Sequence, residues 1–235
     1  GYMTDSILED EVVVLEYSGA TGDNVAVPAR FGGAGQQKAY AVAVAPDNDI
    51  YVSGRVNTAG TYDFLLLRYG PDLTLRGTAR KGFGFGTVAR FVLPGGADNV
   101  FIAGGSSIVA YRVADLDTDP VEQWTFTDNK AGTVKALGQW DNGYLVALVD
   151  RPADNSVSVA TLRPDGSIDW EVVYTSSAQP GGITLSVADT ATVYAGGAQF
   201  NGTDQDIFVA RVGEPVPPPG NGSGGCFIAT AAWGS

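Results

Sequence analysis

The chain of 235 residues contains no histidine, one cysteine and only four lysines. Without histidine it cannot carry a Ser-His-Asp or Cys-His catalytic pair, an imidazole general base, or a histidine ligand for zinc or haem. One cysteine cannot form an internal disulfide, so cysteine usage leaves the redox compartment open. Most familiar enzyme chemistry is therefore excluded, and we expect a non-enzymatic protein with no catalytic residues, metal or cofactor.

Positive charge is also scarce: the chain has 14 basic and 26 acidic residues, and the formal net charge is −12. This balance argues against a surface that follows nucleic-acid phosphates, so no nucleic-acid partner is expected. No apolar run approaches the roughly 20 residues that a membrane-spanning helix needs, and we expect no transmembrane segment.

Glycine, in contrast, is abundant, with 32 residues that lie mostly at the edges of short apolar runs. Such runs, rich in Val, Ile, Tyr and Phe and bounded by turn residues, predict short β-strands. The first five are expected at residues 12–17, 25–31, 40–45, 50–54 and 64–69. No helical stripe longer than two turns is present, so the fold class is all-β.

One sequence phrase recurs four times, at residues 47–54 (DNDIYVSG), 97–104 (ADNVFIAG), 141–148 (DNGYLVAL) and 190–197 (TATVYAGG). The equivalent apolar positions are Ile50, Val100, Tyr144 and Val193, which are 50, 44 and 49 residues apart. Each phrase follows a strand and a turn, and it precedes a third strand and then an often aromatic fourth strand. Four antiparallel strands at this interval predict the blades of a β-propeller.

We therefore predict a small β-propeller of four blades over residues 1–213, a Pro/Gly-rich linker over 214–225 and an apolar C-terminal segment over 226–235. The N-terminal strands match the outer half of a blade, and the last repeat stops after its third strand. Pairing of the N-terminal strand with the last blade would remove two exposed edges. Two stacked sandwiches of the same strands, or a propeller completed by a second chain, are the alternatives.

Residues 38–76 resemble the bacterial propeller repeats called SBBP or delta-sixty repeats, with weaker similarity at 88–113, 134–170 and 183–212. These repeats occur in surface and secreted proteins with no single activity. The resemblance implies the fold and a location at the cell surface or outside the cell, but no chemistry.

The C-terminal residues 222–235 (GSGGCFIATAAWGS) are similar to the CFI-box found near the C-terminus of many bacterial exported proteins, with Trp233 in place of the usual tyrosine. This resemblance implies an exported, surface-associated bacterial protein with a C-terminal sorting or assembly segment. It implies no reaction.

The C-terminal segment also carries the predicted partner-binding or anchoring residues. They form an uncharged run with strand propensity: Cys226, Phe227, Ile228, Ala229, Thr230, Ala231, Ala232 and Trp233. Exposed to water, such a run is prone to associate. It either adds a strand to, or packs in a groove of, a neighbouring subunit or another surface protein, or it covers its own propeller as the missing strand. Cys226 is open to lipidation, to an intermolecular disulfide, or to burial as a small apolar residue.

Other candidate sites are weaker. Asp115, Asp117 and Asp119 are spaced like the start of a calcium loop, but Pro120 and Phe126 occupy the positions of its glycine and bidentate glutamate. Solvated turn aspartates are favoured there.

Two further groups of residues have structural explanations. Five aspartates at hairpin turns are expected to cap their own backbone: Asp47, Asp49, Asp98, Asp141 and Asp189. For Trp124, Trp140 and Trp170, packing between blades is favoured over stacking on sugars.

The sequence thus predicts an exported structural or interaction protein, a subunit or decoration of an extracellular filament or sheath, which contacts itself or another surface protein through its C-terminal segment. A carbohydrate- or ligand-binding propeller module is the alternative.

Overall fold

A computed structural model of the chain describes residues 2–4, 10–33, 35–58, 60–83, 87–95, 98–118, 120–175, 180–189, 192–200 and 203–213. These residues form antiparallel strands and two short 3₁₀ turns, at Val113–Asp115 and Pro152–Asp154. The predicted all-β fold class is confirmed. The chain divides into two compact units, residues 1–125 and 126–235, which are described separately.

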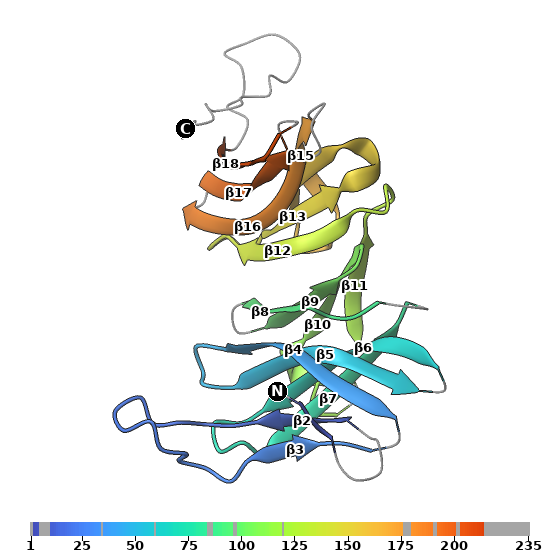
Figure 1. Cartoon of the computed structure of the whole chain (residues 1–235). Coiled ribbons are helices and arrows are strands. Elements are labelled where there is room, and N and C mark those ends of the chain that lie inside the picture. Colours follow the sequence, from blue (N-terminus) through green and yellow to red (C-terminus); the bar gives the residue numbers. More distant parts are fainter. Residues whose placement is uncertain are drawn as a thin grey trace. The chain divides into compact units, whose positions relative to one another are not determined.

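The strands belong to five sheets (Figure 1). The first contains β1 (Tyr2–Thr4), β2 (Asp10–Val14) and β3 (Ala29–Phe31), and the second contains β4 (Gln36–Val44), β5 (Ile50–Thr58), β6 (Thr61–Tyr69) and β7 (Leu75–Gly82). The third contains β8 (Phe91–Gly95), β9 (Asn99–Gly104), β10 (Ser107–Arg112) and β11 (Glu122–Thr127). The fourth contains β12 (Thr133–Gln139), β13 (Leu145–Arg151), β14 (Ser156–Leu162) and β15 (Ile168–Thr175), and the fifth contains β16 (Pro180–Asp189), β17 (Thr192–Phe200) and β18 (Gln205–Gly213).

Each predicted repeat corresponds to one sheet, and the recurring phrase supplies its second strand: β5, β9, β13 or β17. In the three four-stranded sheets the strands pair in sequence order, which is the arrangement of a propeller blade. The fourth strands β7, β11 and β15 lie beside the third strands β6, β10 and β14.

The N-terminal strands require a correction to the predicted pairing. Val12 of β2 lies opposite Tyr2 of β1 and Phe31 of β3, so both sides of β2 are occupied within one sheet. Residues 2–4 therefore take the place beside β2 that the prediction assigned to the last repeat. The N-terminal region forms an additional three-stranded sheet.

In the first unit, the sheet β4–β7 has an apolar core on both faces. Successive residues of β6 point to opposite faces, because side chains alternate along a strand. Phe64 and Leu66 pack in a cluster with Ile102, whereas Leu65 and Leu67 pack in another with Val12 and Val52. The apolar run 64–67 is thus part of a strand that is buried on both faces of its sheet.

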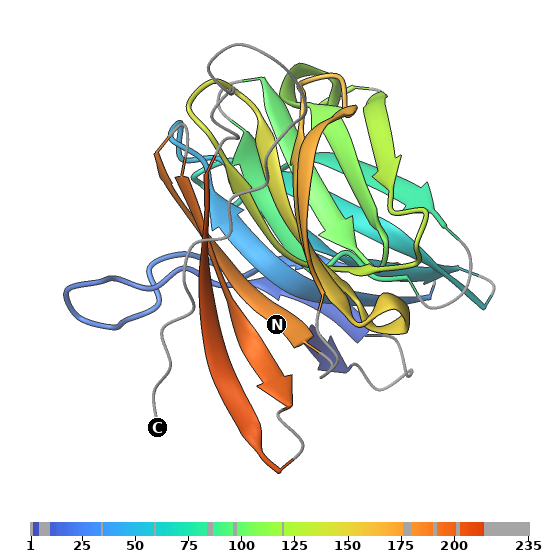
Figure 2. The same cartoon turned by 90° about the horizontal axis from the view of Figure 1, so that it is seen from above.

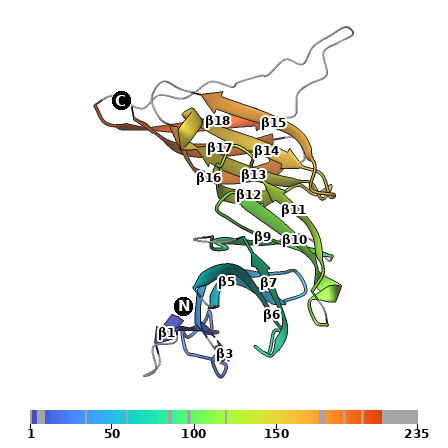
Figure 3. The same ribbon diagram turned by 90° about the vertical axis from the view of Figure 1, so that its right-hand side faces the viewer.

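In the second unit, the sheets β12–β15 and β16–β18 share one core, and Figure 3 shows their strands in two adjacent layers. Val146 and Leu148 of β13 pack with Val157 and Val159 of β14, and with Val193 of β17. This core gives the unit an interior between its two sheets.

A close backbone contact accounts for the glycine that ends three of the recurring phrases. A Cβ on Gly54 would lie 2.0 Å from the carbonyl oxygen of Lys38, and one on Gly197 would lie 2.1 Å from that of Gly181. Both contacts occur beside a β-bulge in the preceding strand. Only glycine fits such an approach, whereas the third repeat has Leu148 at this position.

Candidate interaction surfaces

The predicted partner-binding residues, Cys226 to Trp233, lie outside the described residues, as do Asp119 and the linker 214–225. Their assignment stays a prediction. The surface that leads to them is described, because β18 ends at Gly213, directly before the linker.

β18 is the edge strand of a three-stranded sheet, and Figure 2 shows it in red beside the orange strands β17 and β16. In this sheet β18 holds the position of a third strand, and within the described residues it pairs with β17 alone. The equivalent strands β6 and β14 each pair with a fourth strand. The last repeat is therefore one strand short in the described part of the chain.

The two faces of β18 differ in exposure. Ile207 is 81% exposed and Val209 is 51% exposed. Phe208 and Val212, which alternate with them, pack in the core of the second unit. An apolar cavity of about 40 Å³ lies beside this inner face, lined by Phe208, Val212 and Tyr174 among others. A strand edge with apolar residues on both faces is suited to pairing with another strand.

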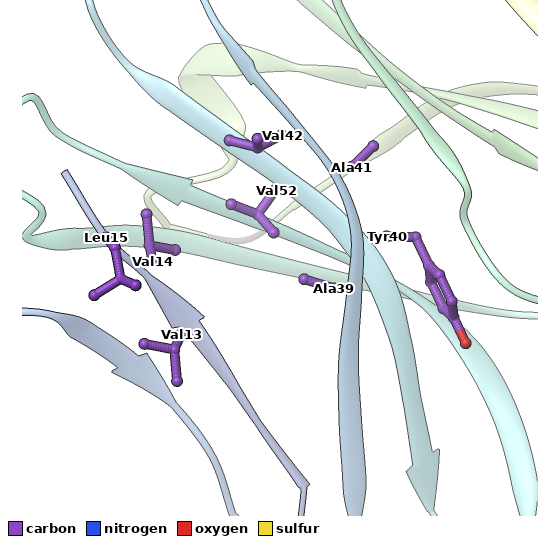
Figure 4. A pocket seen from close by; sticks show the side chains of 8 residues that line it. All are labelled: Val13, Val14, Leu15, Ala39, Tyr40, Ala41, Val42 and Val52. Carbon is purple, nitrogen blue, oxygen red and sulfur yellow. The ribbon is translucent and has the colours of Figure 1, made fainter. Parts of the chain in front are cut away.

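An apolar groove lies in the first unit between β2 and β4 (Figure 4). Its volume is about 330 Å³, and its walls are formed by Val13, Val14, Leu15, Ala39, Tyr40, Ala41, Val42 and Val52. Leu15 and Val42 are exposed. The groove carries no charged side chain, so it fits an apolar rather than an ionic partner.

A more polar hollow of about 360 Å³ lies in the second unit, where Lys135 of β12 and Asp150 of β13 meet residues of β16 and β17. The Lys135 Nζ and Asp150 Oδ2 atoms are 3.8 Å apart, and Asp150 Oδ1 is buried without a hydrogen-bond partner. Burial raises the pKa of Asp150, and Lys135 opposes this only in part. The exposed Phe200 lies on the same wall.

A buried charge cluster lies on one side of the second unit, around Arg151. Its Nη2 atom is 2.6 Å from Asp128 Oδ1 and 2.6 Å from Glu171 Oε1, and the Ser158 hydroxyl also donates to Glu171. The side chains of Arg151 and Asp128 are only 3% and 2% exposed. Burial opposes ionisation of Asp128, but the guanidinium and the Gly132 N–H outweigh it and hold the pKa of Asp128 below its usual value.

A second charge cluster lies in the first unit around Asp49, which is buried. Its carboxylate accepts hydrogen bonds from Arg68 Nε at 2.7 Å and from Arg76 Nη1 at 2.8 Å. Arg68 Nη1 also donates to Asp117 Oδ1 at 2.9 Å and to the carbonyl oxygen of Val113 at 3.1 Å. Asp117 is therefore bound to an arginine, whereas a solvated turn aspartate was predicted at this position.

Asp49 thus does more than close a turn. The predicted turn function is found at Asp47, whose Oδ1 accepts the Asp49 N–H at 3.1 Å. In contrast, the Asp49 side chain binds two arginines that lie 19 and 27 residues away. Sequence reasoning missed both charge clusters, although a charged residue inside an apolar strand phrase, such as Leu67-Arg68-Tyr69, signals a buried pair.

The aromatic rings pack with one another, but these ring pairs lie within one sheet and not between two blades as predicted. The Trp140 ring lies 5.9 Å from that of Trp170 and 6.5 Å from that of Tyr144, and the Trp124 ring lies 5.7 Å from that of Phe101. Trp140 is buried in the core of the second unit.

Within the described part of the chain, no group of three His, Cys, Asp or Glu side chains could hold a metal ion. None of the helices described there is long and apolar enough to cross a membrane. Ten ion pairs are found between described residues, and they engage eight cationic side chains: Arg30, Lys38, Arg68, Arg76, Lys81, Lys135, Arg151 and Arg163.

No family model matches the sequence, and no curated protein is similar to it. Among solved structures, a GH43 β-1,3-galactosidase is 12% identical with a TM-score of 0.44, over 92% of this chain and 49% of that one. Prolyl oligopeptidase B from Galerina marginata, bound to a hydrolysis and macrocyclization substrate, is 8% identical with a TM-score of 0.49, over 93% of this chain and 33% of that one. The chain thus spans about half and a third of these proteins. Similarities at this level carry no argument about activity, substrate or partner.

Proposed function

We propose that this chain is a structural subunit or decoration of an extracellular surface assembly, such as a filament or sheath, and that residues 226–233 make the contact between subunits or anchor the protein. The observation that carries the proposal is the incomplete last repeat. In the described residues it ends in the edge strand β18 with exposed apolar residues. The chain then continues through the linker 214–225 into the uncharged run 226–233, which has strand propensity. An open edge and a free strand are the two parts that β-augmentation requires.

The charge clusters of both units support a structural function. The carboxylates of Asp49 and Asp128 are bound by buried arginines, so neither is available for proton transfer.

The proposal is tested by comparing the full chain with a chain that lacks residues 221–235. Sedimentation velocity and electron microscopy of the full chain should show ordered multimers, and the shortened chain should sediment as a monomer with an unchanged melting temperature. An unchanged sedimentation coefficient with a lower melting temperature would show instead that the segment only covers its own propeller.

The second candidate is a carbohydrate- or ligand-binding module, and the hollow beside Lys135 and Asp150 favours it. An aromatic ring beside a charged pair can hold a sugar by stacking and hydrogen bonds. Saturable binding of a sugar by the monomer, lost in Asp150→Ala and Phe200→Ala, would support this function.

A further inference from the structure

We infer that the edge of β18 is the surface that receives residues 226–233 of a second copy of this chain, which add to the last sheet as its fourth strand. This inference rests on the proposed function and names the receiving surface of the contact between subunits. The edge is formed by residues 205–213, of which Ile207 and Val209 are the exposed apolar side chains.

No described strand fills the fourth position beside β18. In the sheets β4–β7 and β12–β15 the third strand is paired antiparallel along most of its length by a fourth strand of eight residues, β7 or β15. In an antiparallel sheet, the backbone groups of alternate residues point away from the existing neighbour. About half of the nine residues of β18 therefore present N–H and C=O groups at its outer side, and the uncharged run 226–233 also has eight residues.

β18 also carries fewer of the cationic residues that protect another edge strand, β7. The fourth strand β7, which ends its sheet, contains Arg76, Arg80 and Lys81. Charged residues of this kind prevent further strand addition. β18 contains neither lysine nor proline and has one cationic residue, Arg211, and one acidic residue, Asp206. Its side chains Ile207 and Val209 are apolar and exposed. Its edge resembles the edge of an inner strand that is normally covered.

The connection between β18 and the segment also favours a second copy. In the sheets β4–β7 and β12–β15 the third and fourth strands are joined by five-residue turns, closed by hydrogen bonds from Gly70 N–H to Thr74 O and from Arg163 N–H to Ser167 O. In the sheet β8–β11 the connection has nine residues. After β18 the sequence is Pro215-Val216-Pro217-Pro218-Pro219. Proline lacks the N–H that such a turn needs, and proline-rich segments favour an extended conformation of about 3.1 Å per residue. This sequence favours a segment that reaches another copy over a hairpin back to its own strand.

The inference is tested by a disulfide trap that uses the single native cysteine. Antiparallel addition places Cys226, at the start of the segment, near the end of β18. We expect Arg211→Cys to form disulfide-linked multimers when the purified full chain is oxidised with diamide, seen as a ladder on a non-reducing gel that a reductant removes. Two controls should give at least several-fold less disulfide-linked multimer. They are Arg211→Cys combined with Cys226→Ser, and Ile183→Cys on the opposite edge strand β16.

A second set of variants tests the same surface without oxidation. Ile207→Lys combined with Val209→Lys places two charges on the edge at exposed positions, so the melting temperature should be unchanged while the tail-dependent multimers are lost. Ile183→Lys, the matched control at an exposed apolar position of the same sheet, should retain them. Val42→Lys in the apolar groove between β2 and β4 should also retain them.

Three results would overturn the inference. These are a disulfide formed within a monomer of Arg211→Cys, cross-linking no greater than in the controls, and multimers that persist in the double lysine variant or are lost in Val42→Lys. If removal of residues 221–235 still abolishes the multimers in any of these cases, the proposed function stands and only the receiving surface is wrong. If the unmodified chain forms no tail-dependent multimer, the proposed function itself fails.

Discussion

Replacement of Arg151 by methionine tests the buried charge cluster of the second unit most directly. Methionine retains much of the apolar stem of arginine but removes the guanidinium from between Asp128 and Glu171. The Asp128 carboxylate then stays buried and, among the described residues, keeps only backbone donors: the Gly132 N–H, at 2.7 Å, and the Lys130 N–H. Loss of one partner from a buried ion pair costs about 3–5 kcal/mol, so we expect Arg151→Met to lower the free energy of unfolding by that amount.

The cluster also predicts a pH dependence. Because the pKa of Asp128 is lowered in the folded protein, its contribution to stability is present above the ordinary pKa of 3.8 that the group has when unfolded. This contribution is lost as the pH falls through the folded pKa. Arg151→Met should remove this contribution. The free energy of unfolding of the variant should then fall less steeply, as the pH falls below 3.8, than that of the unmodified protein.

The assay is urea unfolding monitored by the fluorescence of Trp140 and Trp170, which lie in the same unit. Arg163→Met, which removes an exposed pair with Asp169, is the control and should leave the unfolding curve unchanged. Arg151→Met combined with Asp128→Asn should be less destabilised than Arg151→Met alone, because no unpaired charge is left. A loss below about 1 kcal/mol in Arg151→Met would refute the reasoning, since exposed pairs contribute no more than that.

Three further substitutions test other features of the structure. Tyr69→Phe removes a buried hydroxyl that has no hydrogen-bond partner, and it should stabilise the protein by about 1 kcal/mol in urea unfolding. Burial raises the pKa of Tyr69 to about 12, so the free energy of unfolding of the native protein should fall as the pH rises from 10 through 12. The variant should not show this fall. Gly54→Ala should destabilise by about 1–3 kcal/mol through its clash with the Lys38 carbonyl, whereas Gly19→Ala, which has nothing within 4 Å, should be neutral. Asp150→Asn should stabilise the protein at neutral pH but not below about pH 3.8, because the raised pKa of this carboxyl makes the charged form unfavourable in the folded state; an equal effect at both pH values would contradict the burial argument.

The repeats were predictable because their signals are local. Turn residues such as Asp47 and Asn48 lie directly before the apolar run that begins at Ile50, and β5 begins at that residue. The alternation of side chains then fixes which residues face each core. The sheets of the four repeats follow from these patterns without knowledge of distant contacts.

The N-terminal sheet and the charge clusters were not predictable in this way. β1 has only three residues, Tyr2–Thr4, which is too short for a periodic pattern, and its pairing depends on β2. Arg151 is 23 residues from Asp128 and 20 from Glu171, so the cluster forms only once the strands are in register. The sequence shows which residues are charged, but not which of them form ion pairs.

Most basic side chains are bound in ion pairs, and this affects how two copies of the chain associate. Eight of the 14 basic side chains are already bound to carboxylates of the same chain, and the excess of acidic groups remains. Two copies that approach each other therefore meet a repulsive field, which ions shorten to a range of about 10 Å at 0.1 M salt. Ionic strength should thus control the proposed contact between subunits: a low salt concentration disfavours it, and a high salt concentration permits it.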